Sequence, residues 1–186
     1  MKSHIIQAIR LTIVTIVLFS GIYTLILYGI GQAAPNQGKG EVVEYKGKKY
    51  YANIGQEFNQ DQYFWSRPSA VDYNAAGSAG SNKGPSNPEY LEAVKARIDT
   101  FLVHNPGITK SQIPVDLVTA SGSGLDPNIS LQAAKVQIKR IAKIRQVPEN
   151  KLAALVDQHT EKPLLGLFGP EKINVLKLNI ALDELK

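Results

Sequence analysis

The strongest constraint on this 186-residue chain is an uncharged apolar run at residues 11–30. No Asp, Glu, Lys or Arg occurs between Arg10 and Lys39. A helix of about 20 residues spans roughly 30 Å, which is the thickness of the hydrocarbon core of a bilayer. Inside lipid, a lone segment can satisfy its backbone polar groups only as a helix. The run therefore predicts a single transmembrane helix at residues 11–30.

The charges around this run predict its orientation. Lys2 and Arg10 precede it, and no acidic residue occurs before Glu41. Because basic flanks stay in the cytoplasm, we expect residues 1–10 inside and the chain from residue 31 onward outside. A cleaved signal peptide is the alternative, because Gly31 and Ala33 are small residues of the kind found at cleavage sites. Signal-peptide cores are usually about 7–15 residues long, so the length favours a retained anchor.

Small and weakly polar residues occur along the predicted span, and they leave two interpretations open. They are Thr12, Thr15, Ser20, Gly21 and Thr24. Small residues let a second helix approach closely in a membrane. Alternatively, the hydroxyl groups bond back to carbonyl groups of their own helix.

Composition limits the kind of domain that the rest of the chain can form. After a linker at residues 31–40, residues 41–186 are enough for one domain with its own core. The net charge of +5 falls to +3 without Lys2 and Arg10, which is too modest to predict a nucleic-acid partner. The absence of cysteine excludes disulfides, Cys nucleophiles and Cys-ligated zinc.

Local patterns predict an α+β domain with a small antiparallel sheet and about three helices. Two β-prone runs around Lys46-Gly47 indicate a hairpin at residues 41–52. Asn87 and Pro88 form a helix start, and further helices are expected at residues 131–145 and from Val147 onward. A short strand is expected at residues 114–120. A half-buried strand is expected at residues 176–183, because apolar residues alternate there with others.

Residues 55–88 show neither helical nor strand periodicity, but their aromatic residues argue against disorder. We therefore expect an ordered, irregular loop. Its side chains have two interpretations. In one, they anchor a partner, since Trp, Tyr and Arg are enriched at binding hot spots. In the other, they pack beneath the loop as a satellite core. The candidates are Tyr63, Phe64, Trp65 and Arg67.

A basic stripe occupies one side of the helix expected at residues 131–145. Lys135, Lys139 and Lys143 recur every fourth residue, joined by Arg140 and Arg145. Like charges at this spacing destabilise a helix slightly, so an acidic partner or anionic lipid headgroups would compensate them. The alternative is a solvated face.

No recognisable catalytic motif is present. The Gly- and Ser-rich segment 121–130 lacks the residues of a phosphate loop, a dinucleotide fingerprint or a nucleophile elbow, so we interpret it as a capped turn. His104 and His159 fall near predicted helix ends, where a cation suits the dipole, with no metal-binding pattern around them. We expect no catalytic or metal residues, and an interaction domain rather than an enzyme.

Four stretches together resemble the KdpC family, the C subunits of the bacterial high-affinity potassium-transporting P-type ATPase. They lie at residues 63–70, 80–88, 114–130 (followed by Gln137 and Arg140) and 174–183. The resemblance runs in order along the whole chain. It implies a non-catalytic, single-pass subunit in the cytoplasmic (inner) membrane of a bacterium, with its C-terminal domain outside.

The resemblance also implies partners. These are a channel-like potassium-binding subunit, a P-type ATPase subunit, membrane lipid and, as a further candidate, a small additional membrane subunit. ATP and potassium would be handled by those partners, with no cofactor bound by this chain alone. A Gln corresponding to Gln137 is proposed in the family to assist nucleotide binding, as part of a catalytic-chaperone role. The predicted topology places Gln137 across the membrane from cytoplasmic ATP, so we expect that support to be indirect.

Two other functions stay open from the sequence. One is a membrane-tethered extracytoplasmic hydrolase, for which His159 is a candidate residue. The other is a subunit that contacts ATP directly, which requires the opposite topology.

Overall fold

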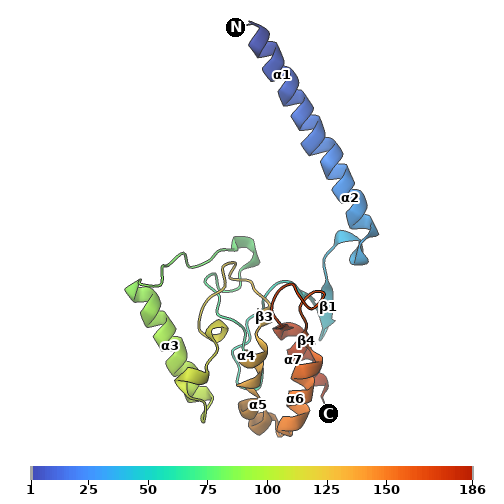
Figure 1. The fold of residues 1–186 in the computed structure, drawn as a ribbon. Coiled ribbons are helices and arrows are strands. Elements are labelled where there is room, and N and C mark those ends of the chain that lie inside the picture. Colours follow the sequence, from blue (N-terminus) through green and yellow to red (C-terminus); the bar gives the residue numbers. More distant parts are fainter. Residues whose placement is uncertain (1, 186) are drawn as a thin grey trace. The chain divides into compact units, whose positions relative to one another are not determined.

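A computed structural model describes residues 2–185, which fall into two compact units divided between Val42 and Val43. The N-terminal unit is mainly one continuous helix, drawn in blue in Figure 1. It comprises α1 (Lys2–Ile16), the π-helical segment η1 (Val17–Ile22) and α2 (Tyr23–Ala33). Residues His4–Ala33 are long and apolar enough to cross a membrane, with a mean hydropathy of 2.2 over their most apolar 18-residue stretch. The expected helix at residues 11–30 is therefore present and extends beyond both predicted ends.

Two hydroxyl groups of this helix bond back to its own backbone. Thr15 Oγ1 donates to the Thr12 carbonyl at 2.9 Å, and Thr24 Oγ1 donates to the Phe19 carbonyl at 3.1 Å. The second bond spans the widened π-helical turn. At these two positions the hydroxyl groups therefore bond to carbonyl groups of their own helix, which is the second of the two interpretations given above.

The helix ends at a short connection to the C-terminal unit. Ala34 is extended, and a 3₁₀ turn η2 (Pro35–Gly38) follows. Asn36 and Gln37 have φ angles of 66° and 53°, in the left-handed region where the helix cannot continue. The expected linker at residues 31–40 thus loses its first residues to the helix.

The C-terminal unit has helices and short strands. Its helices are α3 (Pro88–His104), α4 (Leu131–Lys135), α5 (Ile138–Arg145), α6 (Glu149–Gln158) and α7 (Val175–Glu184), with 3₁₀ turns η3 (Ala75–Gly77), η4 (Lys110–Gln112) and η5 (Val115–Leu117). Its strands are β1 (Val42–Tyr45), β2 (Lys48–Tyr51), β3 (Asn128–Ile129), β4 (Thr160–Glu161) and β5 (Lys172–Asn174).

Two small sheets are present among the described residues. β1 and β2 form the predicted hairpin, and a second sheet has the order β3-β5-β4. Both pairs in the second sheet are antiparallel, with Ile173 opposite Ile129 on one side and Thr160 on the other. Its strands are only two or three residues long, so the sheet serves to join the helices rather than to form a separate layer.

The core lies among the C-terminal helices, which stand side by side in Figure 1. α6 packs against α4, α5 and α7. Ile141 from α5, Leu152 from α6 and Leu178 from α7 are all fully buried. Phe64 and Phe101 enter the same cluster from the irregular loop and from α3. The α+β class predicted from the sequence is confirmed.

Two predicted strands are wrong. Residues 176–183 belong to helix α7. Asn174 is the N-cap of this helix, and its side chain accepts a hydrogen bond from the Lys177 amide. The buried residues fit a helix as well as an alternating pattern, because Val175, Leu178 and Leu182 are spaced by three and four. Residues 114–120 contain the turn η5, which lets Asp116 accept hydrogen bonds from the backbone and side chain of Ser130.

The helix expected at residues 131–145 is divided at Gln137. Its side-chain Nε2 donates to the Ala133 carbonyl at 2.9 Å, and its backbone N–H turns to the Ala134 carbonyl instead. The side chain thus takes the carbonyl that a regular helix would give to the backbone. The division matters because it aims the Gln137 amide toward the irregular loop.

Helix α3 is only partly buried. Phe101 is the buried residue of α3. Leu91 is exposed. The reason is that α3 lies at the edge of the unit, where only its C-terminal part reaches the core (Figure 1).

The helical form of α7 makes a test possible by core truncation. Leu178 is fully buried, whereas Ile180 is only partly buried. We expect Leu178→Ala to reduce the free energy of unfolding by about 2–5 kcal/mol and Ile180→Ala to cost clearly less. Urea unfolding of the full chain in detergent, followed by the fluorescence of Trp65, measures both. Equal losses would support the alternating strand instead.

Candidate functional site

The irregular loop and the helices beneath it contain most of the predicted site residues. Phe64 is fully buried, and its backbone N–H and carbonyl both bond to the side-chain amide of Asn179 at 2.9 Å. Asn179 belongs to α7 and is 2% exposed. A side-chain amide can accept and donate hydrogen bonds at once, so Asn179 supplies Phe64 with the two backbone hydrogen bonds that a neighbouring strand would otherwise provide. Phe64 is therefore buried, as the second interpretation expected, but it belongs to the main core rather than to a satellite core.

Trp65 is held by Gln137 and Arg140. The Trp65 backbone N–H donates to Gln137 Oε1 at 2.7 Å, and Arg140 Nη2 donates to the same oxygen at 2.9 Å. The Arg140 guanidinium carbon lies 4.5 Å from the centre of the Trp65 ring, which is cation–π geometry. Trp65 also meets the edges of Phe101 and His104.

Gln137 is fully buried, and its amide bonds are made within the fold. They join the Ala133 carbonyl, the Trp65 N–H and Arg140. In this structure the side chain that the family resemblance linked to nucleotide binding connects α4 and α5 to the irregular loop.

Arg140 is a buried cation without an ion pair among the described residues. It is 6% exposed, and its hydrogen bonds go to neutral oxygens of Tyr63 and Gln137. Its Nε and Nη1 have no hydrogen-bond partner within the described part of the chain. Burial lowers the pKa of Arg140 to about 10, so the group keeps its charge at neutral pH. Arg140 is therefore not part of the exposed basic stripe predicted from the sequence, because its side chain is buried.

The remaining lysines of the stripe do lie on the surface. Lys135 is 3.8 Å from Asp157, whereas no ion pair is found for Lys139 or Lys143 among residues 2–185. Both lysines line a cavity of about 480 Å³ between α5 and the end of α3. Asn105 lines it too, and the buried Asn105 Oδ1 lacks a donor among the described residues. The cavity lining has three cationic side chains, Lys139, Arg140 and Lys143, against one carboxylate, Asp61.

His104 and Asp61 also line this cavity. His104 belongs to the last turn of α3, and its Nδ1 is 2.8 Å from Oδ1 of Asp61 in the irregular loop. His159 Nδ1 lies 2.9 Å from the Leu155 carbonyl. Within residues 2–185 no group of three His, Cys, Asp or Glu side chains is placed to hold a metal ion.

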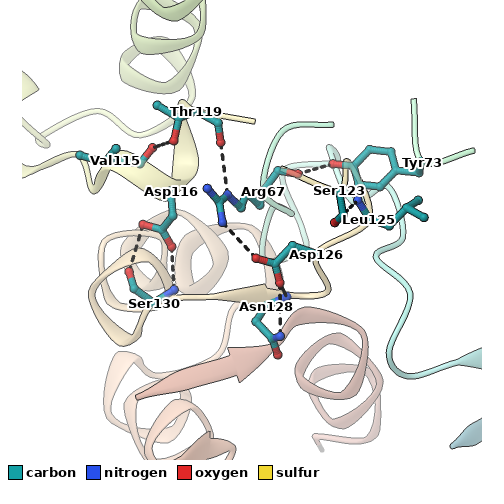
Figure 2. Close-up of polar contacts among 10 residues, drawn as sticks. All are labelled: Arg67, Tyr73, Val115, Asp116, Thr119, Ser123, Leu125, Asp126, Asn128 and Ser130. Atoms are coloured by element: carbon teal, nitrogen blue, oxygen red, sulfur yellow. Dashed lines mark hydrogen bonds and ion pairs between the residues drawn. The ribbon is translucent and has the colours of Figure 1, made fainter. Parts of the chain in front are cut away.

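Arg67 does not lie against α5, unlike Tyr63 and Trp65 of the same irregular loop. Figure 2 shows its guanidinium between the Thr119 carbonyl, at 3.3 Å from Nε, and Asp126, at 3.0 Å from Nη1. Asp126 Oδ1 also accepts from the Asn128 N–H, while the Arg67 carbonyl accepts from the Tyr73 hydroxyl. Arg67 thereby fastens the loop to residues 121–130. The expected Ser130 cap is present there, but residues Asn128–Ile129 form strand β3 rather than part of a turn.

Asp183 gathers four donors from three parts of the unit. They are the Tyr45 hydroxyl, Lys46 Nζ at 3.0 Å, the Tyr63 hydroxyl at 3.0 Å and Arg145 Nη2. Burial alone would raise the pKa of Asp183, but these donors together hold it well below its usual range. This carboxylate joins the hairpin, the irregular loop and α5 to α7.

Sequence reasoning missed Asp183, Asn179 and Asn105, and it assigned Arg140 to the wrong face. Asn179 and Asp183 were expected on the polar side of a strand, and only the helical register turns them toward the loop. The one available signal was Asn174, since Asn is a preferred N-cap.

Comparison with known proteins places the whole chain in one group. Residues 5–184 match the family model described as KdpC: K+-transporting ATPase, c chain. Curated relatives named potassium-transporting ATPase KdpC subunit include one from Flavobacterium johnsoniae, 57% identical over 184 residues, which cover 98% of this chain and 99% of the relative. One from Bacteroides thetaiotaomicron is 55% identical over 97% of both chains. One from Caldanaerobacter subterraneus is 45% identical over 99% of this chain and 96% of the relative.

The Gln137 contacts predict a stability effect. Gln137→Leu removes the acceptor of the Trp65 N–H and of Arg140, so we expect a loss of about 1–3 kcal/mol in the free energy of unfolding. The control Gln132→Leu changes an exposed residue of α4 and should stay within about 0.5 kcal/mol of wild type. Urea unfolding of the full chain measures both, and comparable losses would contradict the assignment.

The low pKa of Asp183 predicts a dependence on pH. A carboxylate whose pKa is lower in the folded than in the unfolded state stabilises the fold above its unfolded pKa of about 3.9, and this contribution falls as pH decreases further. We expect Asp183→Asn to be about 1–3 kcal/mol less stable than wild type at pH 7, with a difference that narrows below about pH 4. The control is Asp99→Asn, at an exposed site of α3. The prediction would be contradicted if the difference in the free energy of unfolding between Asp183→Asn and wild type stayed constant from pH 7 to pH 3.

Proposed function

The chain belongs to the KdpC family of K+-transporting ATPase c chains, and we propose that it is a non-catalytic subunit of an ATP-driven potassium-uptake complex. The observation that carries the proposal is the match over nearly the full length of both this chain and its relatives. The chain would contribute assembly and stability to the complex, while partner subunits bind ATP and potassium.

The apolar helix supplies the membrane part of this role. Residues His4–Ala33 would be retained as a single-pass anchor that docks against the transport subunits. The basic residues before the span and the absence of acidic ones there favour a cytoplasmic N-terminus. The C-terminal unit would then work on the extracytoplasmic side of the cytoplasmic membrane and cover that face of its partners.

The environment of Gln137 supports an indirect influence on ATP. Its amide is fully buried and hydrogen-bonded to three groups of the fold, so contact with a nucleotide would require breaking these bonds. Any effect of this side chain on ATP affinity would therefore pass through the shape of the C-terminal unit and the conformations of its partners.

The cavity beside Lys139 and Lys143 is the best-supported docking surface. Unpaired lysines and the buried Arg140 charge favour an acidic group. An acidic peptide segment of a partner subunit offers such a group. In contrast, Phe64 and Arg67 are already used inside the unit, so truncating them would test folding as much as docking.

Charge removal at the cavity tests this surface. We expect Lys139→Gln with Lys143→Gln to reduce recovery of the partner subunits about tenfold, because several charged contacts would be lost at once. The measurements are co-purification after expression of the complete complex and its potassium-stimulated ATPase activity.

The matched control removes two lysines elsewhere on the unit. Lys95→Gln with Lys110→Gln has the same charge change at exposed positions and should leave recovery unchanged. Normal recovery and activity of the Lys139 and Lys143 variant would reject the cavity as a docking surface. Failure of the wild-type chain to co-purify with any transport subunit would reject the proposed function itself.

A further inference from the structure

The turn at residues 163–170 presents a cluster of large apolar side chains to solvent. Leu164 is 69% exposed, Leu165 81%, Leu167 82% and Phe168 63%. No charged residue occurs between Lys162 and Glu171. Scattered apolar residues on a surface are ordinary, but four within five positions form a contiguous patch of the kind that marks a contact site.

The turn holds these side chains outward by its own hydrogen bonds. Leu164 and Phe168 exchange backbone bonds at 3.0 Å in both directions, and Gly166 N–H donates to the Pro163 carbonyl. Leu165 has a φ of 55°, which is uncommon for a non-Gly residue. The segment is thus a closed, ordered turn with its apolar side chains outside.

The chemistry of this patch fits lipid better than a protein surface. Its side chains are aliphatic or phenyl groups without hydrogen-bonding atoms, whereas protein hot spots are enriched in Trp, Tyr and Arg within a polar rim. Leu and Phe are among the residues with which interfacial amphipathic helices enter the boundary between headgroups and acyl chains, to a depth of about 5–10 Å, and an exposed turn can present the same side chains.

The chain itself tethers the C-terminal unit to any bilayer that holds the apolar helix. The candidate span ends at Ala33 and strand β1 begins at Val42. The residues between them, 34–41, can extend by at most about 28 Å. Tethering at this length converts a weak contact into an intramolecular one with a high effective concentration.

We propose that the turn at residues 163–170 inserts Leu165, Leu167 and Phe168 into the surface of the bilayer that holds the apolar helix. The inference rests on the proposed function in one respect, because it requires the helix to be a retained anchor. The turn gives the C-terminal unit a second point of contact with the membrane and limits its rotation about the linker.

The absence of cysteine allows a direct test with single labels on the full chain. The variants Leu167→Cys, Val115→Cys and Leu27→Cys are labelled with a nitrobenzoxadiazole fluorophore and reconstituted into vesicles of phosphatidylcholine and phosphatidylglycerol. Some of the lipids carry a nitroxide near the headgroup. Val115 is the matched control, since it is apolar and 70% exposed in another part of the same unit. Leu27 reports whether the helix is in the bilayer.

We expect nitroxide lipids to quench the label at residue 167 at least threefold more than the label at residue 115. Adding Leu165→Asp and Phe168→Asp should abolish this difference, which excludes insertion driven by the fluorophore. Equal quenching at 167 and 115, with strong quenching at 27, would overturn the inference and leave the anchor intact. Absent quenching at 27 would overturn the anchor and the inference together.

A second arm uses the assembled complex with its partner subunits. Strong lipid quenching at residue 167 in the complex supports membrane contact. A label there that is shielded from both nitroxide lipid and aqueous iodide would show that a protein covers the turn, which also overturns the inference. Co-purification of the partners with the same variant tests the proposed function separately.

Discussion

The backbone of Phe64 and the N–H of Trp65 obtain their hydrogen bonds from side chains rather than from a neighbouring strand. Asn179 serves Phe64 in both directions, and Gln137 accepts from Trp65. Unpaired polar groups at this depth would be costly, so these two amides determine whether the loop can lie on the domain at all. The positions of Tyr63 and Arg140 follow from the same arrangement, since the Tyr63 carbonyl accepts from the Arg140 guanidinium.

Features with strong local signals could be predicted from sequence, and those decided by burial could not. The apolar helix, the hairpin and the Asn87 cap depend on composition or on two or three adjacent residues. Helix α7 failed because its apolar residues satisfy both a period of two and a helical face over so short a length. Only packing against α6 selects the helix, although the cap at Asn174 was visible in the sequence.

The candidate site divides in the same way. An ordered aromatic loop and a lysine stripe were predictable, because composition and spacing reveal them. Which cation of the stripe turns inward was not, since Arg140 leaves the surface only where the helix is divided at Gln137. The outcome is a unit whose aromatic residues mostly build its interior, while its free charges and its exposed turn remain available to other molecules.

The carboxylate of Asp183 has a consequence for the order in which the chain matures. Its donors Tyr45, Tyr63 and Arg145 are made long before it, and Tyr45 precedes it by 138 residues. During synthesis, the hairpin and the irregular loop therefore lack the Asp183 carboxylate, their common hydrogen-bond acceptor, until helix α7 has been made. Segments that await a distant partner are exposed to proteases and to wrong contacts in the interval. The hydrogen bonds to Asp183 can therefore form only once the chain has been made through α7, so they mark a unit whose elements are all present.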